Sequence, residues 1–476
     1  PSFFLMMLIF FVSLLYMFLV MTRFVDVYDE GLILTGAMRV AAGEIIHRDF
    51  YANYGPAQFY VLSWLFDVFG YNVSVERVFD LSIRSGIVSL IYITTIRYTK
   101  RWIAMIVTAI CGVWLGFVGT YGYPVYPALL LAIGSTLLMT KALSRVTSVT
   151  YPFVAGILVG LVALFRYDVG FLAFLSQITA AILILFVLGR KNRLAVEGRV
   201  CWLLSPYVLG AGLTVGAVIF LYCLNGVLHD FLHDLVFYPV ENYAAMRGLP
   251  FPNLERLFSV RSFFLWIADV VIYLPVMICL MAFWVFVIDG RAERDSVIKS
   301  MEGEGGAVYR DEIIIFLVLF SSLAAFFYLK GAVRVSAVHM QLSIIPALMV
   351  LAVIFGCVKK NEIGLFKYFL NGLAVFAVVS AVIAGPMGER GGGIRVLDDI
   401  GVFSVIQNSD EPVNDVAVSD ALGRYKNKRI FLLGDDREAA VQYLLMHTTP
   451  GQRIFVGLTR HDKIIQNDVS AYFLTQ

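Results

Sequence analysis

The chain has 476 residues, of which 59% are hydrophobic and only 15% are charged. Soluble domains carry about 25% charged residues, so this composition excludes a soluble globular protein. The formal net charge of +2 gives no reason to expect a nucleic-acid partner.

Long apolar runs recur along the chain, and they predict an all-α polytopic membrane protein with eleven transmembrane helices. A run of about 17 to 25 apolar residues is long enough to cross a bilayer as a helix. Inside lipid, a helix satisfies its backbone hydrogen bonds within the segment itself. The predicted spans are residues 3–21, 81–97, 102–119, 124–140, 150–165, 169–189, 201–223, 263–288, 313–329, 341–358 and 368–386.

The long connection between the first two spans, residues 22–80, is predicted to have internal structure. Residues 31–43 are expected to form a helix that ends at Gly43. Residues 58–69 are too short to span the bilayer and are rich in aromatic side chains. This composition is typical of a helix that lies in the membrane interface.

After the last predicted span the chain changes character. Short apolar runs at residues 429–433 and 453–457 have the length of strands, and residues 437–447 between them have a helical pattern. This order is typical of a β-α-β unit. We therefore predict a transmembrane domain over residues 1–386 and a small extracytoplasmic α/β domain over residues 387–476, which we expect to be truncated.

The distribution of lysine and arginine predicts the topology. Sixteen basic residues fall in one set of connections, whereas the short connections on the other side hold only Arg166, Lys330 and Arg334. Cytoplasmic loops are rich in lysine and arginine, so the first set is placed in the cytoplasm. The N-terminus is then cytoplasmic, and three long segments are extracytoplasmic: residues 22–80, 224–262 and 387–476.

The densest group of charges follows the first span and contains Asp26, Asp29 and Glu30. A carboxylate at the membrane rim can act as a general base for an attacking hydroxyl, and a second carboxylate can orient the acceptor or a metal. The alternative is a solvated acidic turn that merely follows a span. The predicted spans hold few charges, with Arg84 near one helix end and Asp269 inside the eighth run. This distribution favours surface chemistry over a transporter, whose ionisable groups lie near the midplane.

The first long connection also carries motifs that resemble a known superfamily. These motifs are Tyr28-Asp29-Glu30-Gly31, Gly43-Glu44, His47-Arg48-Asp49-Phe50-Tyr51 and Tyr54-Gly55-Pro56. Together with the order of spans and loops, they resemble the GT-C glycosyltransferases, and among these the protein O-mannosyltransferase and aminoarabinose transferase group. The resemblance implies a GT-C-like fold, a polyprenyl-phosphate-linked sugar as donor and a single displacement that inverts the anomeric centre.

Carried over residue by residue, the resemblance makes Asp29 the catalytic base and Glu30 its neighbour. Relatives often have a Lys-Pro-Pro element where this chain has Tyr-Gly-Pro, so another residue must bind the carrier phosphate. The substrate pocket is expected to be lined by Asp26, His47, Arg48 and Tyr54 of this connection, together with Tyr243 and Arg247 of the second long extracytoplasmic segment.

Arginine, lysine or histidine must meet the negative charge that develops on the departing lipid phosphate. Arg166 lies at the tip of the hairpin formed by the fifth and sixth spans, and its alternative role is a local pair with Asp168. Lys330, Arg334 and His339 precede the tenth span, and their alternative is ordinary snorkelling at a helix end. Arg334 and His339 together are the preferred phosphate clamp.

The sequence leaves a metal site open. His229 and His233 are four residues apart and have aspartate neighbours, but no third metal ligand has a fixed position. The five cysteines show neither metal-binding nor disulfide spacing. No Walker or dinucleotide-binding motif is present, so a divalent metal is the one cofactor considered.

We therefore predict a glycosyltransferase of hexosyl- or pentosyltransferase type in a bacterial inner membrane. Its donor would be a sugar on a polyprenyl-phosphate carrier, and its acceptor a hydroxyl of a lipid, glycan or protein at the extracytoplasmic face. Two alternatives stay open. One is a non-catalytic scaffold or assembly subunit with the same shape, and the other is a transporter of lipid-linked solutes.

Overall fold

The structure is a computed structural model, and it describes residues 3–21, 29–117, 121–144, 148–188, 193–238, 240, 249–252, 263–289 and 306–357. Within these residues every regular element is a helix, and two isolated bridges are the only β pairing. Seven of the described helices are long and apolar enough to cross a membrane, and four shorter helices are also apolar. The prediction of a mainly helical chain with several helices able to span a membrane is confirmed for the described residues.

Ten of the eleven predicted spans coincide with helices. The eleventh, residues 368–386, lies outside the described residues, as does the predicted α/β domain. The two helices predicted in the first long connection are present. The helices are α1 (Phe3–Val20), α2 (Asp29–Ala41), α3 (Ala57–Phe69), α4 (Val73–Thr95), α5 (Arg101–Phe117), α6 (Val125–Ser144), α7 (Thr150–Phe165), α8 (Tyr167–Leu188), α9 (Arg193–Leu224), α10 (Leu228–Leu232), the π-helical turn η1 (His233–Phe237), α13 (Phe263–Asp289), α14 (Gly306–Gly331) and α15 (Ala337–Cys357).

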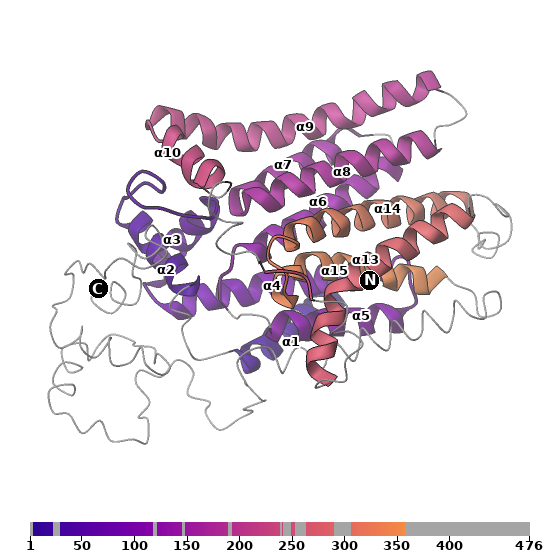
Figure 1. Cartoon of the computed structure of the whole chain (residues 1–476), viewed down its shortest axis with the longest axis horizontal. Coiled ribbons are helices and arrows are strands. Elements are labelled where there is room, and N and C mark those ends of the chain that lie inside the picture. The colour runs from indigo at the N-terminus through magenta and orange to yellow at the C-terminus, as the bar shows by residue number, and fades with distance from the viewer. Residues whose placement is uncertain are drawn as a thin grey trace.

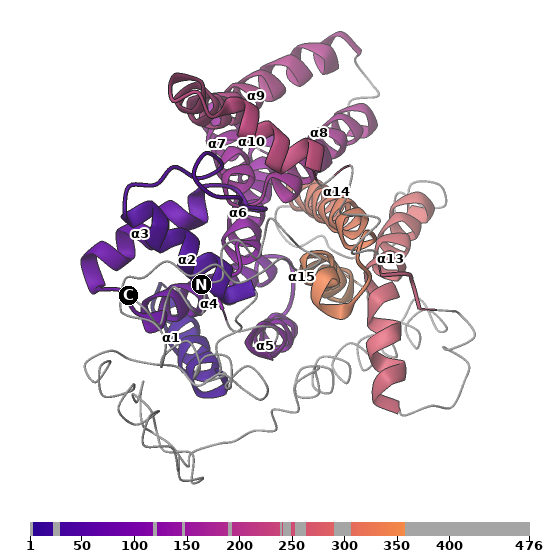
Figure 2. The same cartoon turned by 60° about the vertical axis from the view of Figure 1, so that its left-hand side comes forward.

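The interior of the bundle is formed by α6 and α15. α6 packs against α4, α7, α8 and α14, while α15 packs against α13 and α14 and is mostly buried. Their aliphatic and aromatic side chains belong to one large apolar core. Figures 1 and 2 show α2, α3 and α10 gathered at one end of this bundle, which we call the α2–α3 end.

The contact between α7 and α9 depends on glycines. Gly156 and Gly160 of α7 face α9, and Gly210 of α9 faces the backbone carbonyl of Phe153. A Cβ atom at Gly156 would meet the carbonyl oxygen of Tyr207. Small residues let membrane helices approach backbone to backbone, where van der Waals packing holds them together. α9 is therefore attached to the bundle along a stripe of small residues.

The predicted start of the second span is wrong. The prediction begins at residue 81, whereas α4 begins at Val73 after Asn72, whose side chain accepts a hydrogen bond from the Ser74 N–H at 2.9 Å. The first two turns of α4 contain several charged residues, so the apolar run that predicts a span starts later than the helix. Arg84, predicted near a helix end, lies inside α4 and is fully buried.

α2 and α3 pack on each other around a second, smaller apolar core. This core contains Ile33 of α2, Phe59 of α3, and Tyr222 and Val227 from the end of α9 and the turn that follows it. Gly43, with a φ of +88°, follows α2 and allows the chain to turn, as predicted. The first long connection is therefore a folded layer on one end of the bundle.

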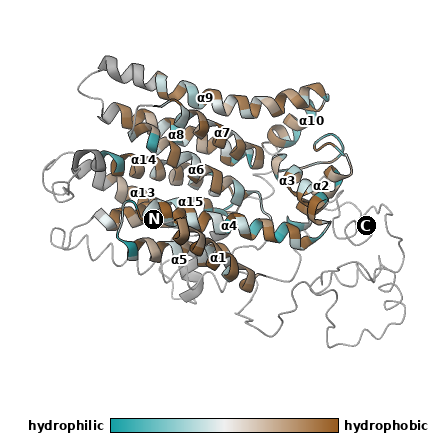
Figure 3. Cartoon of the chain, turned by 180° about the vertical axis from the view of Figure 1, so that it is seen from behind, coloured by the Kyte–Doolittle hydropathy of each residue, from teal (hydrophilic) through white to brown (hydrophobic). Residues whose placement is uncertain are grey.

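α3 exposes an aromatic face. Tyr60, Trp64 and Val68 are spaced four residues apart and are exposed, and Phe69 extends this face. Figure 3 shows that the hydrophobic positions of α3 lie beside the hydrophilic positions of the α2–α3 end. Exposed tryptophan and tyrosine suit the boundary between lipid and water. The predicted helix is confirmed, and its location in the membrane interface stays a prediction.

We expect Trp64 to be within reach of lipids brominated near the headgroup when the protein is reconstituted in vesicles. Trp64→Phe should lower the fraction of tryptophan fluorescence that these lipids quench, because Trp64 is 62% exposed. Trp114→Phe is the matched control, since Trp114 is only 3% exposed. An unchanged quenched fraction in Trp64→Phe would place α3 away from the bilayer.

Candidate functional site

The two acidic residues at the start of α2 have different surroundings. Glu30 is fully buried, and its two carboxylate oxygens accept hydrogen bonds from Nε and Nη2 of Arg77 at 2.7 and 2.9 Å. Arg77 belongs to α4 and is itself 1% exposed. A guanidinium that binds both oxygens of a carboxylate fixes its direction as well as its charge. The pair therefore anchors the first turn of α2 to α4.

Asp29, beside Glu30, is partly exposed. Its Oδ2 atom accepts a hydrogen bond from the hydroxyl of Tyr121 at 3.2 Å. Burial raises the pKa of Tyr121 well above its ordinary value, and the neighbouring charge of Asp29 raises it further. Tyr121 therefore stays protonated at neutral pH and donates to the Asp29 carboxylate.

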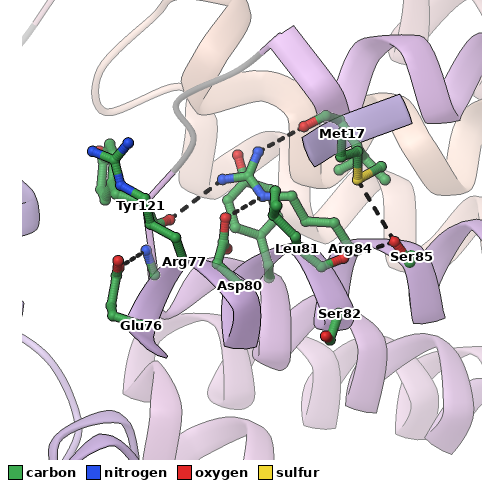
Figure 4. Close-up of polar contacts among 12 residues, drawn as sticks. Met17, Glu76, Arg77, Asp80, Leu81, Ser82, Arg84, Ser85 and Tyr121 are labelled. Carbon is green, nitrogen blue, oxygen red and sulfur yellow. Dashed lines mark hydrogen bonds and ion pairs between the residues drawn. The ribbon is translucent and has the colours of Figure 1, made fainter. Parts of the chain in front are cut away.

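A line of buried polar side chains on α4 lies next to Tyr121, and it consists of Glu76, Arg77, Asp80 and Arg84 (Figure 4). Glu76 accepts a hydrogen bond from the N–H of Gly122. Arg84 forms an ion pair with Asp80 at 2.7 Å and donates to the carbonyl oxygen of Tyr121 at 3.4 Å. Sequence reasoning missed this line because a contact to the connection between α5 and α6 is long-range. The available signal was the four-residue spacing of Glu76, Asp80 and Arg84, which places them on one helical face.

Four tyrosines lie between Asp29 and the turn that joins α7 to α8, and we call them the tyrosine cluster: Tyr54, Tyr121, Tyr123 and Tyr126. Ring centroids of Tyr123 are 5.8 Å from Tyr54, 5.8 Å from Tyr121 and 6.4 Å from Tyr126. The hydroxyl of Tyr123 accepts a hydrogen bond from Nη1 of Arg166 at 3.2 Å. The cluster therefore connects the acidic start of α2 with a basic residue of another part of the chain.

The four predicted phosphate-binding residues gather at this same end, and we call them the cation cluster: Arg166, Lys330, Arg334 and His339. Arg166 also donates two hydrogen bonds to the carboxylate of Asp168, at 2.9 and 2.7 Å. Lys330 is within electrostatic range of Arg166 and Asp168. His339 is within electrostatic range of the three other members. The cluster contains three basic side chains, those of Arg166, Lys330 and Arg334, and one neighbouring carboxylate, Asp168, so it carries a net positive charge when the basic groups are protonated.

The Tyr54-Gly55-Pro56 motif holds the first long connection against the turn between α7 and α8. The N–H of Gly55 donates to the carbonyl oxygen of Phe165 at 3.2 Å, and a Cβ at Gly55 would meet the neighbouring carbonyl of α7. Tyr54 is buried, and the guanidinium carbon of Arg166 lies 5.2 Å from its ring centroid. The glycine is explained by the close approach of two backbones.

Two further predicted pocket residues make their polar contacts elsewhere. His47 is buried with a φ of +73°, and its Nδ1 lies 3.2 Å from Oδ2 of Asp234, so it joins the first connection to η1. Arg48 is exposed and binds Asp49 at 2.8 Å. The hydrogen bond from Arg48 is the main reason that the pKa of Asp49 is lowered to about 2. These contacts stabilise the loop rather than reach Asp29.

The remaining predicted residues divide into two groups. Within the part of the chain that the structure describes, no three histidine, cysteine, aspartate or glutamate side chains form a metal-binding group. His229 pairs with Asp230, and His233 pairs with Asp234, so the two histidines have separate carboxylate partners. Three predicted pocket residues lie outside the described residues: Asp26, Tyr243 and Arg247.

No protein-family model and no curated protein matches this sequence. Among solved structures, the chain is similar to the oligosaccharyltransferase of Archaeoglobus fulgidus. The apo form of that enzyme aligns with a TM-score of 0.48 and 13% identity, over 99% of this chain and 64% of that one. The form in complex with an inhibitory peptide and a dolichol-phosphate aligns with a TM-score of 0.47 and 12% identity, over the same 99% and 64%.

A third structure of that enzyme, tethered with an acceptor peptide, aligns with a TM-score of 0.47 and 12% identity, over 99% of this chain and 63% of that one. The chain therefore spans less than two thirds of the length of the enzyme that it resembles. All three structures are forms of the same oligosaccharyltransferase.

Proposed function

We propose that the chain is a membrane glycosyltransferase that moves a sugar from a polyprenyl-phosphate carrier to an acceptor hydroxyl at the α2–α3 end. One observation carries the proposal: a partly exposed carboxylate and a cation cluster lie at the same end of the bundle, connected by touching groups. Asp29 accepts a hydrogen bond from Tyr121, whose ring lies 5.8 Å from that of Tyr123. Tyr123 in turn accepts a hydrogen bond from Arg166.

In the proposed reaction, Asp29 takes the proton of the acceptor hydroxyl while the hydroxyl oxygen attacks the anomeric carbon of the sugar. The bond between that carbon and the phosphate oxygen breaks, and the polyprenyl phosphate leaves with the electron pair. Preorganised cations stabilise the charge that develops on the leaving phosphate. A single displacement of this kind inverts the anomeric centre. The activated lipid supplies the energy, so the reaction needs no nucleotide.

The position of the cation cluster suits a phosphate tethered to lipid. Arg166 lies between α7 and α8, and the other members lie at the end of α14 and the start of α15. These are ends of apolar helices, where the phosphate of a lipid carrier also lies. A charge at this depth is costly unless it is paired or functional. Arg166 is paired with Asp168, which leaves Lys330 and Arg334 as the source of net positive charge.

The other predicted residues take distinct places in this proposal. Glu30 would orient Asp29 without touching substrate, because Arg77 binds both of its oxygens. Tyr54 borders the cation cluster and stays a proposed substrate residue. His47 and Arg48 are not assigned to the pocket. Three residues remain proposed pocket residues on the sequence alone: Asp26, Tyr243 and Arg247.

We place the α2–α3 end outside the cytoplasm. The connections richest in lysine and arginine join the opposite ends of the helices, which the positive-inside rule assigns to the cytoplasm. A bacterial inner membrane and an extracytoplasmic domain over residues 387–476 belong to the same proposal. The sugar would be a hexose or a pentose, and the acceptor a lipid, glycan or protein.

The test is sugar transfer by the purified protein in lipid vesicles. Radiolabelled hexose and pentose polyprenyl phosphates serve as donors, and membrane lipids, glycans and peptides as acceptors. Labelled product together with released polyprenyl phosphate supports the proposal. Neither product nor released phosphate with every donor would favour the non-catalytic scaffold. Movement of intact donor across the membrane would favour the transporter.

Lys330→Gln is expected to raise the KM for the lipid donor about tenfold, because a charge-assisted contact to phosphate is lost. kcat should fall as well, since the phosphate diester of the donor carries one negative charge and the leaving phosphate gains a second one in the transition state. Lys141→Gln is the matched control: Lys141 is also in the last turn of an apolar helix, but it lies near Tyr151. Equal KM values for the two variants would remove Lys330 from the phosphate site.

A further inference from the structure

The hydrogen bond between Tyr121 and Asp29 is held in place from both sides by buried polar groups of α4. On the Asp29 side, Arg77 binds Glu30 through two hydrogen bonds and so fixes the first turn of α2. On the Tyr121 side, Glu76, the residue next to Arg77, accepts a hydrogen bond from the N–H of Gly122. One helix therefore sets the positions of both members of the Asp29–Tyr121 pair.

The backbone at Tyr121 and Gly122 receives an unusual number of buried polar partners. Besides Glu76, the side-chain amide of Gln58 donates to the carbonyl oxygen of Gly122 at 2.6 Å, and Arg84 donates to that of Tyr121. Glu76, Gln58 and Arg84 are all 0% exposed. Burying polar groups is costly unless they are hydrogen-bonded, so three of them on one dipeptide indicate a tightly fixed turn.

Gly122 is required by this arrangement. A Cβ atom at this position would meet Oε1 of Glu76, so a larger residue would push away the carboxyl group that holds the turn. The turn has no regular secondary structure of its own, and it lies between α5 and α6. Its position is therefore set by side chains of other helices, and the direction of the Tyr121 ring follows from it.

We infer that Tyr121 is a positioning residue for Asp29, and that Glu76 acts through Gly122 to hold Tyr121 in place. This inference rests on the proposed function, in which Asp29 must be ionised to accept a proton. A hydroxyl that donates to a carboxylate stabilises the ionised form and fixes the rotation of the carboxyl group. Tyr121 thereby favours the ionised form of Asp29 and fixes the direction from which it meets the acceptor.

Other charged and titratable groups around Asp29 and Tyr121 also act on the protonation of Asp29, and the Tyr121→Phe variant leaves them unchanged. They are Glu30 of α2, Tyr54 of the first connection, Glu76, Arg77, Asp80 and Arg84 of α4, and Tyr123 and Tyr126 near the start of α6. Each of them stays in place when only the hydroxyl of Tyr121 is removed, so a change in pH dependence after that removal reports on the one hydrogen bond.

The test is the pH profile of kcat for sugar transfer by Tyr121→Phe. Removing the donor raises the pKa of Asp29, so the acidic limb should move to higher pH by about one unit, the size expected when a carboxylate loses one donor. The KM for the lipid donor should stay within about twofold, since no phosphate contact is removed. Tyr71→Phe is the matched control, because the exposed Tyr71 also donates to an aspartate, Asp67.

Two variants of Glu76 test the second half of the inference. Glu76→Gln keeps an oxygen that can accept from Gly122, so its profile should match the wild type. Glu76→Leu removes the acceptor and should reproduce the shift of Tyr121→Phe. Gel filtration checks that each variant is folded. If Glu76→Leu does not fold, the pH profile of Tyr121→Phe alone tests the positioning role of Tyr121.

The outcomes separate the inference from the proposed function. An acidic limb that does not move in Tyr121→Phe, while Asp29→Asn is inactive, would overturn the positioning role and leave the proposed function standing. No transfer by the wild type with any donor would remove the proposed function and the inference with it.

Discussion

Asp29→Asn is expected to lower the rate of sugar transfer by a factor of about 10²–10⁴, the contribution of a positioned general base. Asparagine has nearly the same shape and still offers an oxygen to the hydroxyl of Tyr121, but its amide cannot take a proton from the acceptor. Because Asp29 is partly exposed, its replacement should leave the fold intact. Single-turnover transfer from the lipid donor measures the chemical step.

Asp67→Asn is the control for this experiment. Asp67 is an exposed aspartate of α3, and its loss should leave the transfer rate unchanged. Donor affinity should also be unaltered in Asp29→Asn, since the cation cluster is not touched. Equal rates for Asp29→Asn and the wild type would exclude Asp29 as the base.

Among the variants proposed here, Arg77→Met should cause the largest loss of thermal stability. It leaves Glu30 buried without its ionic partner, and breaking a buried ion pair from one side costs about 3–5 kcal/mol. We expect a large fall in the midpoint of thermal unfolding in detergent, followed by intrinsic fluorescence. Because the pair anchors α2, activity should fall together with stability.

Removing the charge of Glu30 as well should recover much of the thermal stability that Arg77→Met loses. The double variant Arg77→Met with Glu30→Leu replaces both charges by apolar groups of similar size, which is often neutral for a buried pair. Arg48→Met is the control for removing an arginine, because Arg48 is exposed and its ion pair contributes little. A thermal midpoint of Arg77→Met equal to that of Arg48→Met would contradict the role given to the buried pair.

Most helices could be predicted from the sequence, because a long apolar run in lipid has few alternatives to a helix. α4 could be predicted only in part. Its first turns carry Glu76, Arg77 and Asp80, and a charged segment is typical of a loop unless its partners are known. Those partners come from other parts of the chain, including Glu30 and the Gly122 backbone, so local sequence could not reveal them.

The candidate site was also predicted in part. The acidic pair and the basic residues could be found because each stands out locally against an apolar chain. The sequence places both Arg166 and Lys330 in short connections on the same side of the membrane, and the two residues do lie close together. The separate surroundings of Asp29 and Glu30, and the part played by Tyr121, depend on contacts between distant segments. No local pattern distinguishes a tyrosine that donates to Asp29 from one that fills the core.

The stripe of glycines between α7 and α9 has a consequence far from its own location. α9 continues into α10 and η1, and η1 carries Asp234, the residue that contacts His47 of the first connection. A leucine in place of Gly156 would push α9 outward and carry this end of the chain with it. The packing of α7 against α9 and the contact between Asp234 and His47 are thus mechanically linked, so a change at the glycine stripe is transmitted to the first long connection.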